Sequence, residues 1–229
     1  MGRQPRACSR AGRHVRAGPP ALVLAGTGVS CRVTDPGTPT IVVVEYDPAW
    51  VETFERVRDT VWRVVHDVAL SVEHVGSTAV PGLWAKPIVD VDVVVRDEAA
   101  VALAITRLAT IGYGHRPEIG LTGREAFEAP RGDPSLAPHH LYVCPRGSVA
   151  LRNHLAVRDH LRAFPASTRA YGALKRRLAR EHQHDIDAYV AGKTDFVLAI
   201  LRAADFAPEE LEAIERINRS PTGRRPDGR

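Results

Sequence analysis

The stretch EHVGSTAVPGLWAKPIVDVDVVV, residues 73–95, joins a Gly-Ser turn to an apolar segment that contains two aspartates. The apolar run bounded by turn residues predicts a strand over residues 88–95. In a strand, residues i and i+2 lie on the same face roughly 6 to 7 Å apart, so Asp90 and Asp92 are expected to be neighbours. The opposite face is then lined by Val89, Val91, Val93 and Val95.

Two carboxylates held this close repel one another, and burial raises the cost by several kcal/mol unless a cation compensates. Mg²⁺ is commonly bound through one or two carboxylates together with substrate phosphates. The pair Asp90 and Asp92 therefore predicts half of a phosphoryl- or nucleotidyl-transfer site that holds Mg²⁺ or Mn²⁺. The alternative is an ordinary pair at a solvated strand end that holds a loop or a lysine.

The Gly-Ser turn favours the phosphate-binding interpretation. Gly76 and Ser77 offer backbone N–H groups and a hydroxyl on which phosphate oxygens can rest, and glycine lets the backbone approach closely. Pro81 and Gly82 predict a second turn before Lys86, which we count among the candidate phosphate-binding residues.

The remaining pattern predicts an α/β (α+β) fold, with a small mixed sheet flanked by helices and an all-helical C-terminal part. Further strands are expected at residues 41–44, 72–75, 126–129 and 139–143. Helices are expected from Asp47-Pro48 to about Ala69 and from Asp97 to near Gly112. From Val149 to about Ala204 the pattern is helical, and we expect Pro165 and Gly192 to divide it into three helices.

These elements predict one domain over residues 39–205, in which 39–145 form the sheet core and 149–205 a helical cap. Residues 1–38 are rich in Arg, Gly and Pro and are expected to be a disordered basic extension, or to lie partly upstream of the natural start. Residues 206–229 are expected to be an acidic-then-basic tail, largely disordered at its end.

Charge is distributed unevenly along the chain. The formal charge of +4 comprises +6 from residues 1–34, −5 from residues 35–217 and +3 from residues 218–229. Because the excess of arginine belongs to the two ends, the predicted domain itself is acidic, and a nucleic-acid partner is not expected.

The cysteines and the hydropathy pattern indicate the compartment. Cys8, Cys31 and Cys144 are odd in number and lack the C-x₂-C spacing of a zinc site. No stretch approaches the roughly 20 apolar residues of a membrane span, and residues 21–26 are too short for a secretion signal. We therefore expect a cytoplasmic protein without a membrane partner.

Several motifs together resemble one family. The motif of hydrophobic-Gly-Ser, twelve residues and Asp-hydrophobic-Asp-hydrophobic resembles the signature of the polymerase-β-like nucleotidyltransferase superfamily. Within it, the chain is similar to the GrpB family from about Ile41 to Ala204. The stretches that carry this resemblance are YDPAW, EHVGSTAVPGLWAKPIVDVDV, HHLYV, HLAVRDHLRAFP, YGALKRRLA and YVAGKTDFV.

The resemblance implies that Gly76 and Ser77 hold the triphosphate of an NTP, expected to be ATP, while Asp90 and Asp92 ligate Mg²⁺. The superfamily usually adds a third carboxylate on a later strand, but HHLYV contains no acid. Two residues are candidates to replace it, namely His140 as a proton acceptor and Glu128 on the neighbouring strand as a metal ligand.

Other phosphate candidates are Arg124, Lys175 and Lys193, and each lysine could equally be an ordinary helix lysine. Two classes of function follow. One is an enzyme that transfers a nucleoside monophosphate from NTP to a small-molecule hydroxyl or amine. The other is a non-catalytic nucleotide-binding module with a link to dephospho-CoA kinase, to which the family is sometimes fused.

Overall fold

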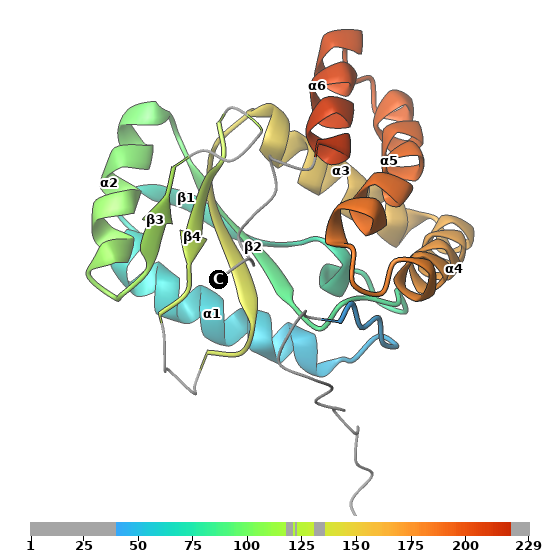
Figure 1. Cartoon of the computed structure of the whole chain (residues 1–229). Coiled ribbons are helices and arrows are strands. Elements are labelled where there is room, and N and C mark those ends of the chain that lie inside the picture. The colour runs from blue at the N-terminus through green and yellow to red at the C-terminus, as the bar shows by residue number, and fades with distance from the viewer. Residues whose placement is uncertain (1–39, 118–120, 122, 131–135, 221–229) are drawn as a thin grey trace, which may run out of the picture. The chain divides into compact units, whose positions relative to one another are not determined.

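The computed structural model describes residues 40–117, 121, 123–130 and 136–220 (Figure 1). The predicted basic extension 1–38 and the end of the predicted tail lie outside the described residues. Among the residues that are described, no helix combines the length and the apolar character needed to cross a membrane.

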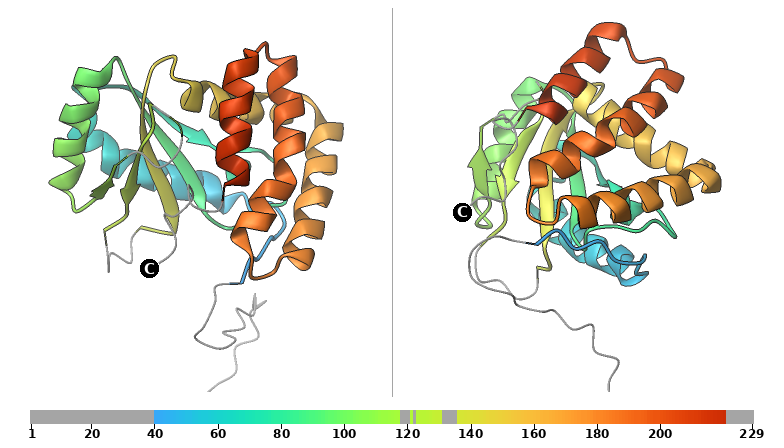
Figure 2. Two further views of the ribbon diagram at one scale, coloured as in Figure 1. Left: turned by 45° about the horizontal axis from the view of Figure 1, so that its top comes forward. Right: turned by 45° about the vertical axis from the view of Figure 1, so that its right-hand side comes forward.

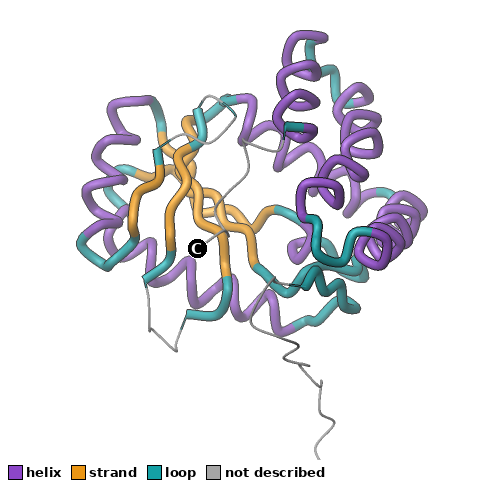
Figure 3. The backbone as a smooth tube through the Cα atoms, in the orientation of Figure 1, coloured by secondary structure: helices purple, strands orange, loops and turns teal. Residues whose placement is uncertain are grey.

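A five-stranded mixed sheet forms the centre of the fold (Figures 1 and 3). The strands follow the order β1-β2-β5-β4-β3. β2 and β5 are parallel, and the other neighbours are antiparallel. Their bounds are β1 Ala69–Val75, β2 Val89–Val95, β3 Gly114–Arg116, β4 Glu125–Glu128 and β5 His139–Pro145. The predicted mixed α/β fold is thus confirmed, and the predicted strand 88–95 is correct to within one residue.

One face of the sheet carries the main hydrophobic core. Helices α1 (Ala49–Val65) and α2 (Glu98–Ala109) cover this face. As predicted, Asp97 caps α2, because its side chain accepts a hydrogen bond from the Ala100 N–H. The core includes the four alternate valines of β2, the buried face of α1 and two residues of β5, Leu141 and Val143.

The C-terminal helices lie on the other side of the sheet (Figure 2). They are α3 Val149–Ala163, α4 Pro165–Glu181, α5 Ile186–Ala203 and α6 Pro208–Arg219. α3 packs Leu151 against Val94 of β2 and Cys144 of β5, on the face that carries the aspartates. A single 3₁₀ turn, η1 (Ser77–Ala79), follows β1 and begins at the Gly-Ser motif.

Three predictions for residues 41–116 need correction. Residues 41–44 form no strand but only one isolated bridge, between Val44 and Ala85. α1 ends at Val65 instead of about Ala69, because residues from Ala69 onward pair with β2 and form a longer β1. The short edge strand β3 was not predicted, and among the described residues it pairs only with β4.

Gly192 does not divide two helices as predicted, since it lies inside α5. The boundary between α4 and α5 lies instead at residues 182–185. His182 is the C-cap of α4, and the Asp185 side chain caps the start of α5. A Cβ atom at Gly192 would lie 2.5 Å from Leu178 Cδ2 of α4. The glycine therefore serves the close approach of two helices and does not terminate one.

Helix α6 replaces part of the predicted tail. Ile214 is fully buried, and it packs in a cluster with Leu198, Leu201 and Phe206. Glu210 Oε2 accepts a hydrogen bond from the Ala207 N–H at the start of the helix. The charged composition of residues 208–219 concealed an apolar stripe at the three-residue spacing of a helix.

Replacing Ile214 with alanine should lower the free energy of unfolding by about 2 to 5 kcal/mol, because it leaves a cavity in this cluster. Leu103→Ala on α2 is the control, since Leu103 is 52% exposed and should change stability by less than about 0.5 kcal/mol. Urea denaturation measures both values. Equal stability of Ile214→Ala and the wild-type protein would mean that α6 does not belong to the core.

Candidate functional site

Each aspartate of β2 is paired with a histidine from another element. Asp90 faces His140 in the register of β2 and β5, and His140 Nδ1 donates to Asp90 Oδ1 over 2.9 Å. His154 on α3 donates from Nδ1 to Asp92 Oδ2 over 2.8 Å. The two carboxylates therefore share a face, as predicted, and part of their charge is balanced by protein groups.

The two aspartates differ in exposure. The Asp90 side chain is 30% exposed, whereas the Asp92 side chain is fully buried. Asp92 Oδ1 has no hydrogen-bond partner in the described part of the chain. Because a buried carboxylate oxygen without a donor is unfavourable, this atom has spare capacity for a cation or a donor.

Positive groups around Asp90 keep it charged. Burial alone would raise the pKa of Asp90, but the hydrogen bond from His140 and the charges of His140, His154 and Lys193 hold that pKa below its usual value. Asp90 is therefore an anion over the physiological range.

Gly76 packs directly against Asp90. Its backbone has φ of 68°, and a Cβ atom there would lie 2.1 Å from Asp90 Oδ2. Only glycine fits both the positive φ and this contact. The glycine of the Gly-Ser motif thus sets how closely the turn approaches the carboxylate.

Lys175 of α4 reaches the same turn from the opposite side. Its Nζ donates to Ser77 Oγ over 2.8 Å, although the residue is only 2% exposed. Burial and the nearby charge of Lys193 lower the pKa of Lys175 well below its usual value, while Asp90 opposes this shift. Whether the buried Lys175 carries a proton therefore depends on the negative charge near it, which Asp90 supplies in part.

Several of the residues described above line a cavity of about 340 Å³. It lies between the sheet and the helices α3 to α6. Three residues capable of acid–base chemistry, Asp90, His140 and His154, meet four cationic residues there. The cationic residues are Lys86, Arg124, Lys175 and Lys193. The Arg124 guanidinium lies 4.8 Å from the centre of the Tyr142 ring, which also lines the cavity.

Seven of the ten predicted site residues line this cavity, namely Ser77, Lys86, Asp90, Arg124, His140, Lys175 and Lys193. Gly76 lines a neighbouring cavity of about 220 Å³. Asp92 does not line either cavity, because it lies buried against His154. Glu128 is not among the residues that line the cavity, and it accepts a hydrogen bond from Arg116 over 2.9 Å.

The residues present fit a Mg²⁺ ion that takes most of its ligands from a substrate. Asp90 opens on the cavity, and Asp92, on the same face of β2, keeps a buried Oδ1 that has no hydrogen-bond partner among the described residues. Within residues 40–117, 121, 123–130 and 136–220, no group of three His, Cys, Asp or Glu side chains is arranged to hold a metal ion. Two carboxylates are nevertheless sufficient when substrate phosphates and water complete the coordination.

His154 is the main residue that sequence reasoning missed. It lies 62 positions after Asp92, so no local spacing connects the two. A signal was present, because His154 is the first residue of the HLAVRDHLRAFP motif.

The other histidines near the site have structural roles. His139 faces away from His140, and its Nε2 lies 2.7 Å from the Tyr113 hydroxyl oxygen. His74 Nε2 lies 3.0 Å from Thr78 Oγ1, and its ring stacks on Phe54.

The chain is similar in sequence and in fold to proteins of one family. The family model described as GrpB protein matches residues 40–203. The chain belongs to the GrpB family. The crystal structure of the conserved protein GrpB from Enterococcus faecalis is 36% identical, with a TM-score of 0.62, and the comparison covers 76% of this chain and 98% of that one.

Two other proteins that are similar to the chain are considerably longer. The chain is 31% identical over 157 residues to the UPF0157 protein YqkA of Bacillus subtilis (strain 168), which is 69% of this chain and 45% of YqkA. It is 30% identical over 188 residues to a dephospho-CoA kinase of Mycolicibacterium paratuberculosis (strain ATCC BAA-968 / K-10), which is 72% of this chain and 46% of the kinase. The chain thus spans less than half the length of each.

Replacing Gly76 with alanine should lower the free energy of unfolding by more than the roughly 1 to 2 kcal/mol that a positive φ alone costs alanine. The added methyl group must also displace Asp90. Gly147→Ala is a matched control, because Gly147 has φ of 84° and a Cβ atom there would meet nothing within 4 Å. Similar losses for the two variants, measured by urea denaturation, would refute the close contact with Asp90.

His74 should make stability depend on pH. Burial lowers the pKa of His74 to about 4 from an ordinary 6.5. The unfolded chain therefore takes up a proton below pH 6.5 while the folded chain does not, so the wild-type protein should lose about 2 kcal/mol of stability between pH 7.5 and pH 5 through this group. His74→Gln should lose correspondingly less over this range in urea denaturation, and parallel losses would contradict the shift.

Proposed function

We propose that this GrpB protein is a Mg²⁺-dependent nucleotidyltransferase. It would move a nucleoside monophosphate from an NTP, most simply ATP, to a hydroxyl or amine of a small molecule. The observation that carries the proposal is the cavity in which Asp90 and Ser77 face four cationic side chains. Such a mixture of one carboxylate and several cations suits a triphosphate with its divalent metal better than a neutral or cationic ligand.

The chain's own residues would bind and orient the triphosphate. Ser77 and the turn at Gly76 would receive its oxygens, and Lys175 and Lys193 would balance its charge. Lys175 is well suited to this task, because an incoming anion would favour its protonated form and offset the effect of burial. Asp90, supported by Asp92, would hold the metal, which when bound stabilises the charge that develops on the phosphates.

His140 is the better candidate for accepting the proton of the attacking hydroxyl or amine. Its hydrogen bond to Asp90 fixes Nδ1 as the protonated nitrogen, so Nε2 carries the lone pair of the neutral ring. It also lines the cavity. Glu128 is a weaker candidate, because its carboxylate is paired with Arg116 and does not line the cavity.

A non-catalytic nucleotide-binding module is the second candidate. The observation in its favour is that the described part of the chain offers no third acidic residue arranged with Asp90 and Asp92. A module of this kind would be a cytoplasmic protein that binds a nucleotide and acts together with a coenzyme A enzyme. The similarity to a dephospho-CoA kinase supports this link.

The proposal predicts that the full chain, with Mg²⁺ and ATP, releases pyrophosphate in the presence of a pool of small-molecule hydroxyls and amines. Asp90→Asn keeps the shape of the side chain but removes its charge, so the rate should fall by roughly 10² or more. Asp59→Asn is the control, because Asp59 is exposed on α1 and should leave the rate unchanged.

Two other outcomes would contradict the proposed reaction. Equal pyrophosphate release by Asp90→Asn and the wild-type protein would show that the reaction does not depend on this carboxylate. If the wild-type protein released none, yet Mg²⁺ and ATP raised its melting temperature, binding without transfer would be the correct function.

A further inference from the structure

Helix α6 forms part of the wall of the candidate nucleotide cavity, although the family model ends at residue 203, before this helix begins. Ile217 and Asn218 of α6 line the cavity of about 340 Å³. Asn218 also lines the neighbouring cavity of about 220 Å³. A segment beyond the family match therefore contributes to the shape of the site.

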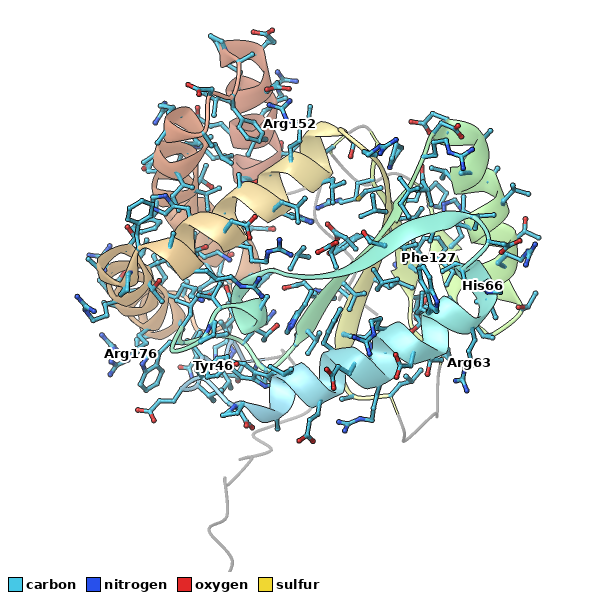
Figure 4. All side chains as sticks on the ribbon, turned by 180° about the vertical axis from the view of Figure 1, so that it is seen from behind. Tyr46, Arg63, His66, Phe127, Arg152 and Arg176 are labelled. Atoms are coloured by element: carbon cyan, nitrogen blue, oxygen red, sulfur yellow. The ribbon has the colours of Figure 1, made fainter. Side chains whose placement is uncertain are left out.

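α6 is held in place by contacts with two other helices. Arg152 of α3 donates to Glu210 Oε1 over 2.7 Å, and its guanidinium lies over the Phe206 ring at 4.5 Å from the centroid. Figure 4 shows Arg152 on α3 beside α6. Arg219 is paired with Asp195 of α5, and Ile214 is fully buried. The wall that carries Asn218 is thus fixed by packing on the rest of the domain.

The carboxamide side chains of two asparagines line both cavities. Asn153 of α3 and Asn218 of α6 line both cavities, and both residues are half-buried. In the described part of the chain, no hydrogen bond joins either side-chain amide to another residue. Each amide offers a donor and an acceptor side by side, so both remain available to a ligand.

We propose that Asn153 and Asn218 form a nucleobase subsite, with Ile217 as part of its apolar wall. Phosphates need cations, and the cavity supplies those separately through its lysines and Arg124. A neutral carboxamide next to an apolar side chain instead suits a planar base, which has apolar faces and an edge of donors and acceptors. The inference rests on the proposed function and extends it from the triphosphate to the base.

Selection of the base would then depend on a helix outside the family match. Relatives that share residues 40–203 could bind the same triphosphate and differ in the base that they prefer. Asn153, which lies within the match, would contribute to binding of the base, and Asn218 would add a contact from outside the match.

The test separates the base from the phosphates by using two kinds of ligand. Binding of ATP, GTP, CTP, UTP and inorganic tripolyphosphate to the full chain is measured with Mg²⁺ by titration calorimetry. Asn218→Ala should weaken the tightest-bound nucleotide by roughly tenfold and leave tripolyphosphate within about twofold. Asn153→Ala, on another helix, should act in the same way.

Glu212→Ala is the matched control, because Glu212 is exposed on α6 and lines neither cavity. Alanine favours helix, so unfolding of α6 is not expected in any of these variants, and melting temperatures check this. If both asparagine variants bound every nucleotide as tightly as the wild-type protein, the base subsite would be refuted. An equal loss of nucleotide and tripolyphosphate would also refute it.

Failure of the proposed function would look different. In that case the wild-type protein would bind neither the nucleotides nor tripolyphosphate, and the base subsite would fall with it. If the wild-type protein bound tripolyphosphate as tightly as every nucleotide, the phosphate site would stand and the base subsite alone would be overturned.

Discussion

Two like charges side by side on one strand are the constraint on which the rest of the site depends. Asp90 and Asp92 lie on the same face of β2, and one of them is fully buried. The repulsion is offset by His140 from β5 and His154 from α3, each within 3 Å of a carboxylate oxygen. The carboxylates therefore also bind the helical part of the domain to the sheet, since α3 must keep its position for Asp92 to remain paired.

The buried Lys175 is a further charge that the site must stabilise. Lys175 has no carboxylate in direct contact in the described part of the chain, and its ammonium group donates to a serine hydroxyl at the start of η1. Burial and Lys193 disfavour this charge, whereas Asp90 and the Tyr171 ring, whose centre lies 4.9 Å from Nζ, favour it. An anion bound at Ser77 would favour the protonated form of Lys175, which is the electrostatic basis of the proposed polyphosphate binding.

Sequence patterns predicted the parts of this structure that depend on local periodicity. The alternation in β2 gave the shared face of the aspartates, and Asp97 gave the start of α2. The pairing of Asp92 with His154 could not be read in this way, because it joins residues 62 positions apart. Gly192 was misread for a related reason, since its role depends on Leu178 of another helix. α6 was missed because its charges outnumber its apolar residues.

The hydrogen bond between His140 and Asp90 also bears on whether the protein is an enzyme or a binding module. Both functions need the turn at Gly76, the hydroxyl of Ser77 and the cations around Asp90. These groups alone therefore do not distinguish the two functions. The distinction lies in whether His140 can take a proton while it remains hydrogen-bonded to Asp90. A carboxylate that accepts from Nδ1 fixes the tautomer and orientation of an imidazole, so the pairing that offsets the repulsion in β2 would also position Nε2 of His140 as a proton acceptor.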